Sequence, residues 1–144
     1  MVRRWVTLGA VAAAGLGIAC SSSPTTTNNC GSGTAPSLVG SYSLTSYTYG
    51  ITVYTPPGAF GKLWYAYSTY ADTITVPGSA GDSTTVDSGT YQVVGSECIN
   101  QQSLAGQRDF AGTFKLTTSN GATTLRVDGN DSLHVIISIW SRSP

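Results

Sequence analysis

Hydrophobic and polar residues alternate along much of the chain with a period of two, the repeat of a β-strand whose two faces lie in different surroundings. The longest run spans residues 132–140, where one face carries only aliphatic side chains. We expect that face, formed by Leu133, Val135, Ile137 and Ile139, to lie in the core. Shorter runs with the same period occur at Tyr42/Leu44, Ile74/Val76, Tyr91/Val93 and Phe114/Leu116.

Turn sequences separate these runs at short intervals. The strongest is Asn120-Gly121, which lies between strands expected at 112–118 and 123–127 and predicts a two-residue type I′ hairpin. Three further turn sequences mark the ends of other strands. They are PPG at 56–58 after a strand near 51–54, PGSAGD at 77–82 between strands at 62–76 and 84–94, and DGND at 128–131 before the last strand.

The residue types also favour strands over helices. Tyr, Thr, Val, Ile and Ser dominate residues 38–144, whereas Glu, a strong helix former, occurs once in the chain, as Glu97. Seven or eight strands joined mostly by tight turns predict an all-β fold. The favoured architecture is a small antiparallel up-and-down β-barrel, and a two-sheet β-sandwich is the alternative.

The start of the chain has the pattern of a secretory signal peptide. Arg3 and Arg4 make it basic, and residues 5–19 are apolar but too few to span a bilayer. Cys20 follows, and the Ser/Thr-rich stretch after it lacks large apolar side chains, which predicts a flexible tether. We therefore divide the chain into a signal peptide at 1–19, a tether at 20–37 and a folded domain at 38–144.

The apolar run that ends at Cys20 resembles the signal peptide of bacterial lipoproteins, whose cysteine becomes the lipidated first residue of the mature protein. The resemblance implies a palmitate-bearing membrane anchor at Cys20 in the cell envelope. Ser21 after the cysteine implies the outer membrane. Ordinary cleavage after Gly17-Ile18-Ala19 is the alternative, and it predicts a secreted or periplasmic protein.

Three cysteines are present, Cys20, Cys30 and Cys98. Exported proteins usually pair their cysteines, so lipidation of Cys20 leaves Cys30 and Cys98 to form a disulfide. Closing a loop of about 70 residues stabilises a fold by roughly 4 kcal/mol. Free thiols or a metal site are the alternatives, but two cysteines without CxxC spacing and the single His134 suit zinc poorly. We expect no metal and no cofactor.

Charged side chains are sparse, at 10% of the chain against the usual quarter. Residues 20–144 contain five Lys and Arg against seven Asp and Glu, and no basic patch is formed along the sequence. Because nucleic-acid binding depends on clustered cationic side chains, we expect no nucleic-acid partner.

Four short motifs of the domain, taken together, resemble small bacterial lipocalin-like lipoproteins. They are LVGSYSL at 38–44, GTY at 89–91, GTFKL at 112–116 and WSR at 140–142. In the wider lipocalin group a Gly-x-Trp opens the first strand, and an arginine of the last strand packs over its ring. The resemblance makes Tyr42 the counterpart of that Trp and Arg142 the candidate arginine, a pair that would close the barrel. The alternative is an ordinary strand tyrosine and an unpaired terminal charge.

One set of residues has the composition of a hydrolase site. Gly81-Asp82-Ser83 and the Asp-x-x-His of 131–134 match the serine and histidine blocks of GDS-type esterases, which supply nucleophile, base and orienting carboxylate. Those enzymes are α/β proteins, and this chain predicts no helices. We therefore expect no enzymatic activity.

The aromatic residues are a better guide to function. Seven of the eight tyrosines lie within residues 42–70, and we expect Tyr47, Trp64, Tyr65 and Tyr67 to contact a ligand. On a strand Tyr65 and Tyr67 share one face and Trp64 lies on the other. Inside a barrel these rings suit a small apolar ligand, and outside they suit stacking on envelope glycan or contact with a protein. A filled core with a wet rim is the third interpretation.

Two hypotheses of function follow. The first is a lipid-anchored envelope barrel that binds a small hydrophobic ligand. The second is a glycan- or protein-binding interaction module that uses exposed aromatic side chains.

Overall fold

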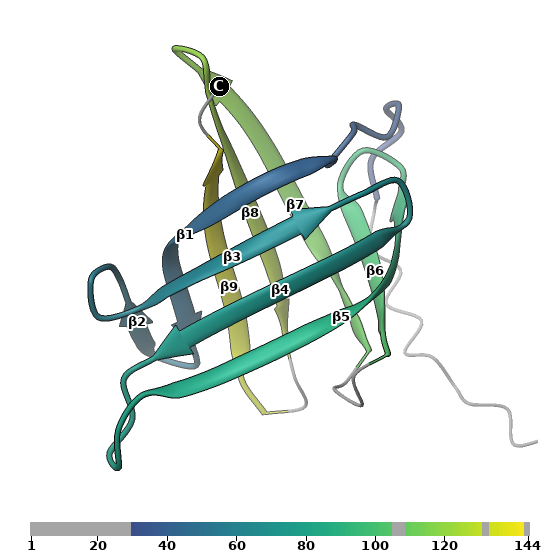
Figure 1. Ribbon diagram of the computed structural model, residues 1–144. Helices are drawn as coiled ribbons and strands as arrows, with labels where there is room; N and C mark the ends of the chain where they lie inside the picture. Colours follow the sequence, from purple (N-terminus) through teal and green to yellow (C-terminus); the bar gives the residue numbers. More distant parts are fainter. Residues whose placement is uncertain (1–29, 105–108, 131–132, 143–144) are drawn as a thin grey trace, which may run out of the picture.

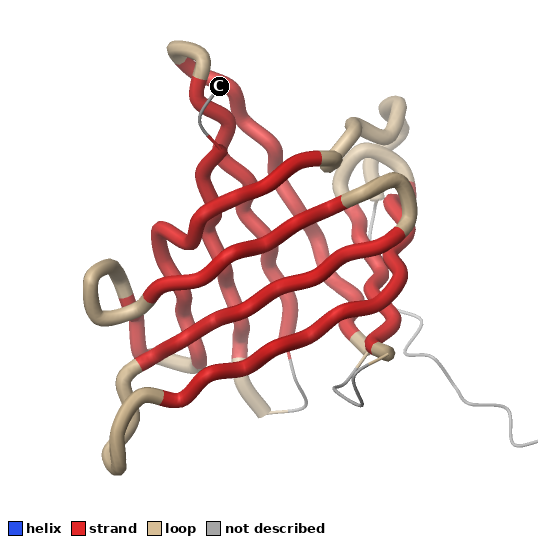
Figure 2. Tube along the Cα trace, viewed as in Figure 1, coloured by secondary structure: helices blue, strands red, loops and turns tan. Residues whose placement is uncertain are grey.

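The computed structural model describes residues 30–104, 109–130 and 133–142. The predicted signal peptide and Cys20 lie outside the described residues. Within those ranges the secondary structure consists of β-strands, without a helix (Figures 1 and 2). None of the described segments forms a helix that is long and apolar enough to cross a membrane.

Nine strands are formed by the described residues, and each pairs antiparallel with its neighbours. Their order in the sheet is β2-β1-β3-β4-β5-β6-β7-β8-β9. The strands are β1 (Gly40–Tyr49), β2 (Thr52–Tyr54), β3 (Phe60–Tyr65), β4 (Thr69–Val76), β5 (Ser83–Val94), β6 (Cys98–Ser103), β7 (Phe110–Ser119), β8 (Ala122–Asn130) and β9 (Val135–Arg142).

The sheet closes on itself because β1 also pairs with β9. The first part of β1 pairs with β3, its last part pairs with the short β2, and its other edge pairs with β9. A register shift between Leu44 and Ser46 bends β1 at this junction, as bulges commonly do. Eight strands therefore form a closed barrel and β2 is an extra strand, which confirms the predicted antiparallel β-barrel and agrees with a lipocalin-like architecture.

The predicted two-residue hairpin is confirmed. Asn120 and Gly121 have φ angles of 50° and 80° between β7 and β8, and type I′ turns require positive φ at both positions. The single strand expected at 62–76 is wrong. The chain turns at 66–68 between β3 and β4, where the amide of Ala66 donates to the carbonyl of Thr69 at 2.9 Å.

The predicted inward face of the last strand is also wrong. Trp140 is 2% exposed, whereas Leu133 is 82% exposed and Val135 is 54% exposed. Trp140 lies opposite Leu44 of β1 and Leu125 of β8, both buried. The indole buries more apolar surface than any aliphatic side chain of the opposite face, so the Trp140 face packs inward.

The predicted disulfide between Cys30 and Cys98 is confirmed, with Cα atoms 5.0 Å apart. The carbonyl of Cys30 also accepts hydrogen bonds from the amides of Ser96 and Glu97, at 2.9 and 3.1 Å. Residues 30–37, which the sequence assigned to the tether, are thus attached at Cys30 to the beginning of β6.

Candidate functional site

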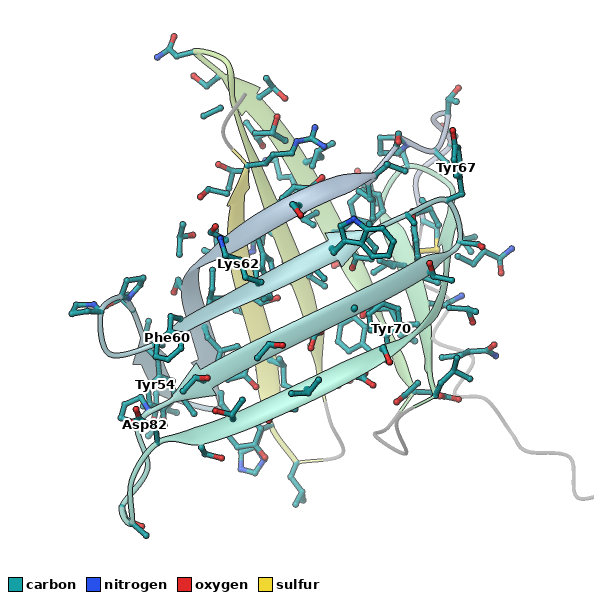
Figure 3. All side chains as sticks on the ribbon, viewed as in Figure 1. Tyr54, Phe60, Lys62, Tyr67, Tyr70 and Asp82 are labelled. Atoms are coloured by element: carbon teal, nitrogen blue, oxygen red, sulfur yellow. A yellow bond between two sulfur atoms is a disulfide. The ribbon has the colours of Figure 1, made fainter. Side chains whose placement is uncertain are left out.

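The four aromatic residues expected to share one ligand occupy different environments. Tyr65 is buried inside the barrel, whereas Trp64 next to it is 48% exposed on the outer surface. Tyr67 is 96% exposed in the loop between β3 and β4, so it does not share a strand face with Tyr65 (Figure 3). Tyr47 is partly buried and stacks on Tyr54, with ring centroids 6.4 Å apart.

Tyr65 is a core residue surrounded by other tyrosines. Its ring centroid lies 4.6 Å from that of Tyr91 and 6.4 Å from those of Tyr42 and Tyr70. Its hydroxyl accepts a hydrogen bond of 3.1 Å from Nε2 of Gln101, and burial raises the pKa of Tyr65 well above its usual value. These neighbours fill the barrel around Tyr65, as the narrow interior of an eight-stranded barrel permits.

Two aspartates that the sequence analysis did not single out also lie on the interior side. Asp72 and Asp87 are register partners on β4 and β5, and Asp72 lies opposite the buried Leu63. Asp87 accepts hydrogen bonds from the hydroxyls of Tyr70 at 2.6 Å and Ser103 at 2.5 Å. Burial and the nearby Asp87 carboxylate raise the pKa of Asp72 to about 7.

The sequence contained a signal for this pair. Asp72 follows the same alternation as Ile74 and Val76, which was recognised as a strand pattern with one buried face. An aspartate in that phase is an inward-facing carboxylate. The inward orientation of Asp72 can therefore be predicted from the sequence, whereas its pairing with Asp87 on β5 depends on the strand register.

Trp64 lies in a shallow groove of about 610 Å³ on the outer face of β1, β3, β4 and β5. It is the large member of a cross-strand row whose other side chains, those of Ser41, Ala71 and Ser88, are small. The indole of Trp64 therefore projects beyond its small neighbours in the row. In the next row Nζ of Lys62 donates to the hydroxyl of Ser43 at 2.7 Å.

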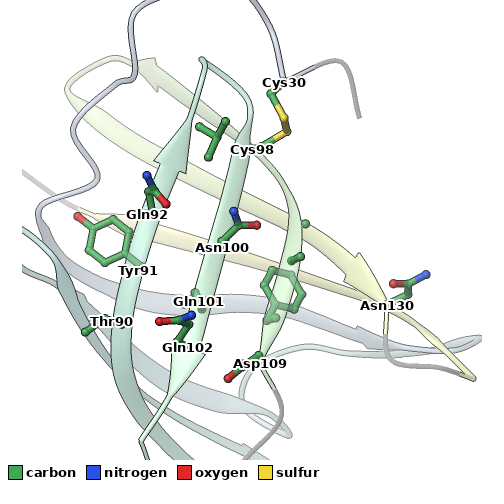
Figure 4. Close-up of a pocket in the computed structure, with 14 residues that line it drawn as sticks. Cys30, Thr90, Tyr91, Gln92, Cys98, Asn100, Gln101, Gln102, Asp109 and Asn130 are labelled. Carbon is green, nitrogen blue, oxygen red and sulfur yellow. A yellow bond between two sulfur atoms is a disulfide. The ribbon is translucent and has the colours of Figure 1, made fainter. Parts of the chain in front are cut away.

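A second and larger groove, of about 830 Å³, lies on β5, β6 and β7 (Figure 4). This groove was not predicted, because no pattern in the sequence indicated β6 as a strand. Its amide side chains include those of Gln92, Asn100 and Gln102, all exposed. The polar run Asn100-Gln101-Gln102 shows no alternation of hydrophobic and polar residues, so only the pairing of β6 with its neighbours places these amides together.

The structure places Arg142 over the ring of Tyr42, with Cζ 5.2 Å from the ring centroid. Nη1 of Arg142 also donates to the carbonyl of Val39 at 2.5 Å, and the Tyr42 hydroxyl donates to the carbonyl of Leu38 at 2.9 Å. Gly40 has φ +149°, and a Cβ there would collide with the Arg142 side chain. The glycine of the Gly-x-Tyr motif thus leaves room for the guanidinium.

The described residues contain no cluster of three or more His, Cys, Asp or Glu side chains arranged to hold a metal ion. His134 stacks on Tyr49 with ring centroids 4.4 Å apart.

Comparison of the chain with protein-family models, with curated proteins and with solved structures finds no match.

Proposed function

We propose that this protein is a lipid-anchored binding module of the bacterial cell envelope that holds neutral glycan on the outer face of its barrel. The observation that carries the proposal is the exposed indole of Trp64 in a groove whose outward side chains are mostly small or hydroxylated, with Lys62 and Val86 in the adjacent row. The apolar-ligand hypothesis is weaker because the interior tyrosine expected to contact such a ligand, Tyr65, is enclosed by the protein's own side chains.

The chemistry of the Trp64 groove suits a sugar ring. The flat apolar face of an indole packs against the C–H face of a pyranose, and the ring keeps a polar N–H for hydrogen bonding. Serine and threonine hydroxyls can both donate and accept, as sugar hydroxyls do. Ser41 and Ser88 lie in the row of Trp64, and Thr73 lies in the adjacent row.

The predicted anchor would keep this surface close to the envelope. If Cys20 carries lipid and Cys30 is held to β6 by the disulfide, only residues 21–29 span the distance between membrane and barrel. That stretch reaches about 30 Å when fully extended. A glycan ligand would accordingly be one found near the membrane surface, such as cell-wall polysaccharide.

Retention on insoluble polysaccharide tests the proposal. The disulfide-intact protein is applied to chitin, cellulose and purified cell-wall sacculi, and the bound fraction is measured against protein concentration. We expect Trp64→Ala to weaken retention at least about tenfold, which corresponds to the loss of one interface hot spot of about 1.4 kcal/mol.

Tyr67→Ala is the matched control, because Tyr67 is an exposed aromatic residue that does not line the Trp64 groove. It should leave retention unchanged. Equal retention of the wild-type protein and Trp64→Ala would refute the role of Trp64, and no retention of the wild-type protein on any of the three polymers would refute the proposed function.

A further inference from the structure

The groove on β5, β6 and β7 presents polar side chains in cross-strand rows (Figure 4). Gln92 of β5 pairs with Asn100 of β6, which pairs with Ala111 of β7. In the next row on the same face, two residues along each strand, Thr90 pairs with Gln102. Successive rows on one face lie about 6.6 Å apart, so the amides and the hydroxyl form a regular array.

These amide groups are available to a ligand. Among the described residues no hydrogen bond links the side chains of Gln92, Asn100 or Gln102 to another part of the protein. The intervening Gln101 behaves differently, because it points inward and donates to the hydroxyl of Tyr65. The alternation of the strand therefore assigns one amide to the core and leaves its two neighbours on the surface.

The groove has fixed boundaries. The Cys30–Cys98 disulfide lies at one end, beside Val94, which pairs with Cys98, and Asp109 lies at the other end (Figure 4). Oδ1 of Asp109 accepts a hydrogen bond of 3.1 Å from the amide of Ser103, which holds the carboxylate in place.

Phe110 lies on the interior side of the sheet beneath the groove, because it pairs with the inward-facing Gln101 and packs against the core. Its ring occupies the space next to Gly112 and Gly129, where a Cβ at either position would collide with it. The ring therefore fills the gap where β8 leaves β7, since their pairing ends at Thr113 and Asp128. The volume of about 830 Å³ lies within the range of small-molecule sites.

The hydrogen-bonding groups of the groove indicate which class of ligand it can bind. Each amide offers one acceptor and two donors, and Thr90 adds a hydroxyl. Among the described residues, the lining includes no Lys or Arg and a single carboxylate, Asp109, so these side chains do not match a phosphate or sulfate. Few exposed apolar side chains line it, chiefly Val94 and Ala111. A neutral ligand with many hydroxyl groups, which both donate and accept, satisfies this surface best.

The two grooves share no lining residue, yet they approach each other along β5. Ser88 lines the Trp64 groove and Thr90, the next outward residue of β5, lines the amide groove. Trp64 on β3 and Asn100 on β6 lie three inter-strand spacings apart and are offset by four residues along the strand direction, which corresponds to roughly 20 Å on a flat sheet.

We infer that the amide groove of Gln92, Asn100 and Gln102 is a second saccharide subsite, which engages a polysaccharide chain at a point away from Trp64. The inference rests on the proposed function for its class of ligand, but on different residues. Two subsites on one surface raise the affinity for a long chain through effective concentration, without a new contact at either subsite. A short saccharide can occupy one subsite and gains nothing from the other.

Calorimetric titration with saccharides of two lengths tests the inference. The probes are the disaccharide and hexasaccharide of β-linked N-acetylglucosamine, with the glucose disaccharide and hexasaccharide as a second neutral series. For the wild-type protein we expect the hexasaccharide of at least one series to bind at least about tenfold more tightly than its disaccharide.

The double variant Asn100→Ala, Gln102→Ala should lose this gain with chain length and keep the disaccharide affinity that Trp64 supplies. Thr117→Ala, Thr124→Ala is the matched control, because these two polar residues are also exposed but lie on β7 and β8 outside the groove. Amide ¹⁵N spectra of the wild-type protein give a readout that needs no variant. The side-chain NH₂ signals of Asn100 and Gln102 should shift with the hexasaccharide, and the Gln101 signal should not.

A gain with chain length that persists in Asn100→Ala, Gln102→Ala would overturn the inference, as would unshifted NH₂ signals in the wild-type protein. A different result would refute the proposed function. If Trp64→Ala leaves both affinities unchanged while the amide variant abolishes binding, the amide groove is a saccharide site and the assignment to Trp64 is wrong. Absence of binding to both series overturns the two together.

Discussion

Replacing Asp72 by Asn should make the protein more stable at neutral and alkaline pH. Asp72 is the interior carboxyl whose pKa is raised to about 7 by burial and by the facing Asp87 carboxylate. In the unfolded chain the same group has a pKa of about 4. The folded barrel therefore prefers the protonated form of Asp72, and ionisation costs stability.

The sign and size follow from proton linkage. Below about pH 4 both states are protonated, and the carboxyl adds no dependence on pH. Between about pH 4 and 7 the folded state binds one proton more than the unfolded state, so the free energy of unfolding falls as pH rises, by about 1.4 kcal/mol per unit. A difference of roughly three units gives a total loss of up to about 4 kcal/mol above pH 7.

Urea denaturation followed by tyrosine and tryptophan fluorescence at pH 4, 6 and 8 measures this directly. Asp72→Asn is neutral at every pH and should be more stable than the wild-type protein at pH 8 by up to about 4 kcal/mol, with a small difference at pH 4. Asp82→Asn is the matched control, because Asp82 is exposed in the loop after β4 (Figure 3). An unchanged fall in stability from pH 4 to 8 in Asp72→Asn would refute the reasoning.

Three further predictions follow from the disulfide, the arginine–tyrosine pair and the signal peptide. Replacing Cys30 and Cys98 together by Ser should lower the free energy of unfolding by about 4 kcal/mol, because the bond closes a separation of 68 residues; a loss under about 1 kcal/mol in urea titration would contradict that. A double-mutant cycle with Tyr42→Leu, which removes the aromatic ring, and Arg142→Ala should give a coupling energy of about 0.5–2 kcal/mol. A coupling energy of zero would show that the contact between guanidinium and ring does not stabilise the fold. Cys20→Ala should move the protein from the detergent phase to the aqueous phase in detergent partitioning, and a variant that stays in the detergent phase would rule out the lipid anchor.

Alternation and turn chemistry predicted most of the barrel because both are local properties of the sequence. The hairpin at Asn120-Gly121 depends on two adjacent residues that accept positive φ, and the flanking runs show their strand period directly. The turn at 66–68 was missed because Ala66, Tyr67 and Ser68 include no Gly, Pro or Asn. Besides the Ala66–Thr69 hydrogen bond within the turn, Tyr91 of another strand holds it, because its hydroxyl donates to the carbonyl of Ala66 at 2.7 Å and its amide donates to the carbonyl of Ser68 at 2.9 Å.

The candidate site was less predictable because it depends on which strands lie side by side. The sequence correctly placed Trp64 and Tyr65 on opposite faces of one strand, but whether either face is covered depends on the closed barrel. The prediction of which face of β9 lies in the core was wrong for a similar reason, since the buried partners of Trp140 come from β1 and β8. The amide groove combines residues from β5, β6 and β7, and no local pattern joins them.

The most direct test of the central claim, that ligand is held outside the barrel, uses the two indole N–H signals of the described residues. Trp64 is exposed, whereas Trp140 is buried and its Nε1 has no hydrogen-bond partner among those residues. In a ¹⁵N spectrum of the protein titrated with the N-acetylglucosamine hexasaccharide, assigned with Trp64→Phe, we predict that the Trp64 signal shifts and the Trp140 signal stays in place. A titration in which fatty acid shifts Trp140 while the saccharide moves neither signal would contradict the account and restore a ligand inside the barrel.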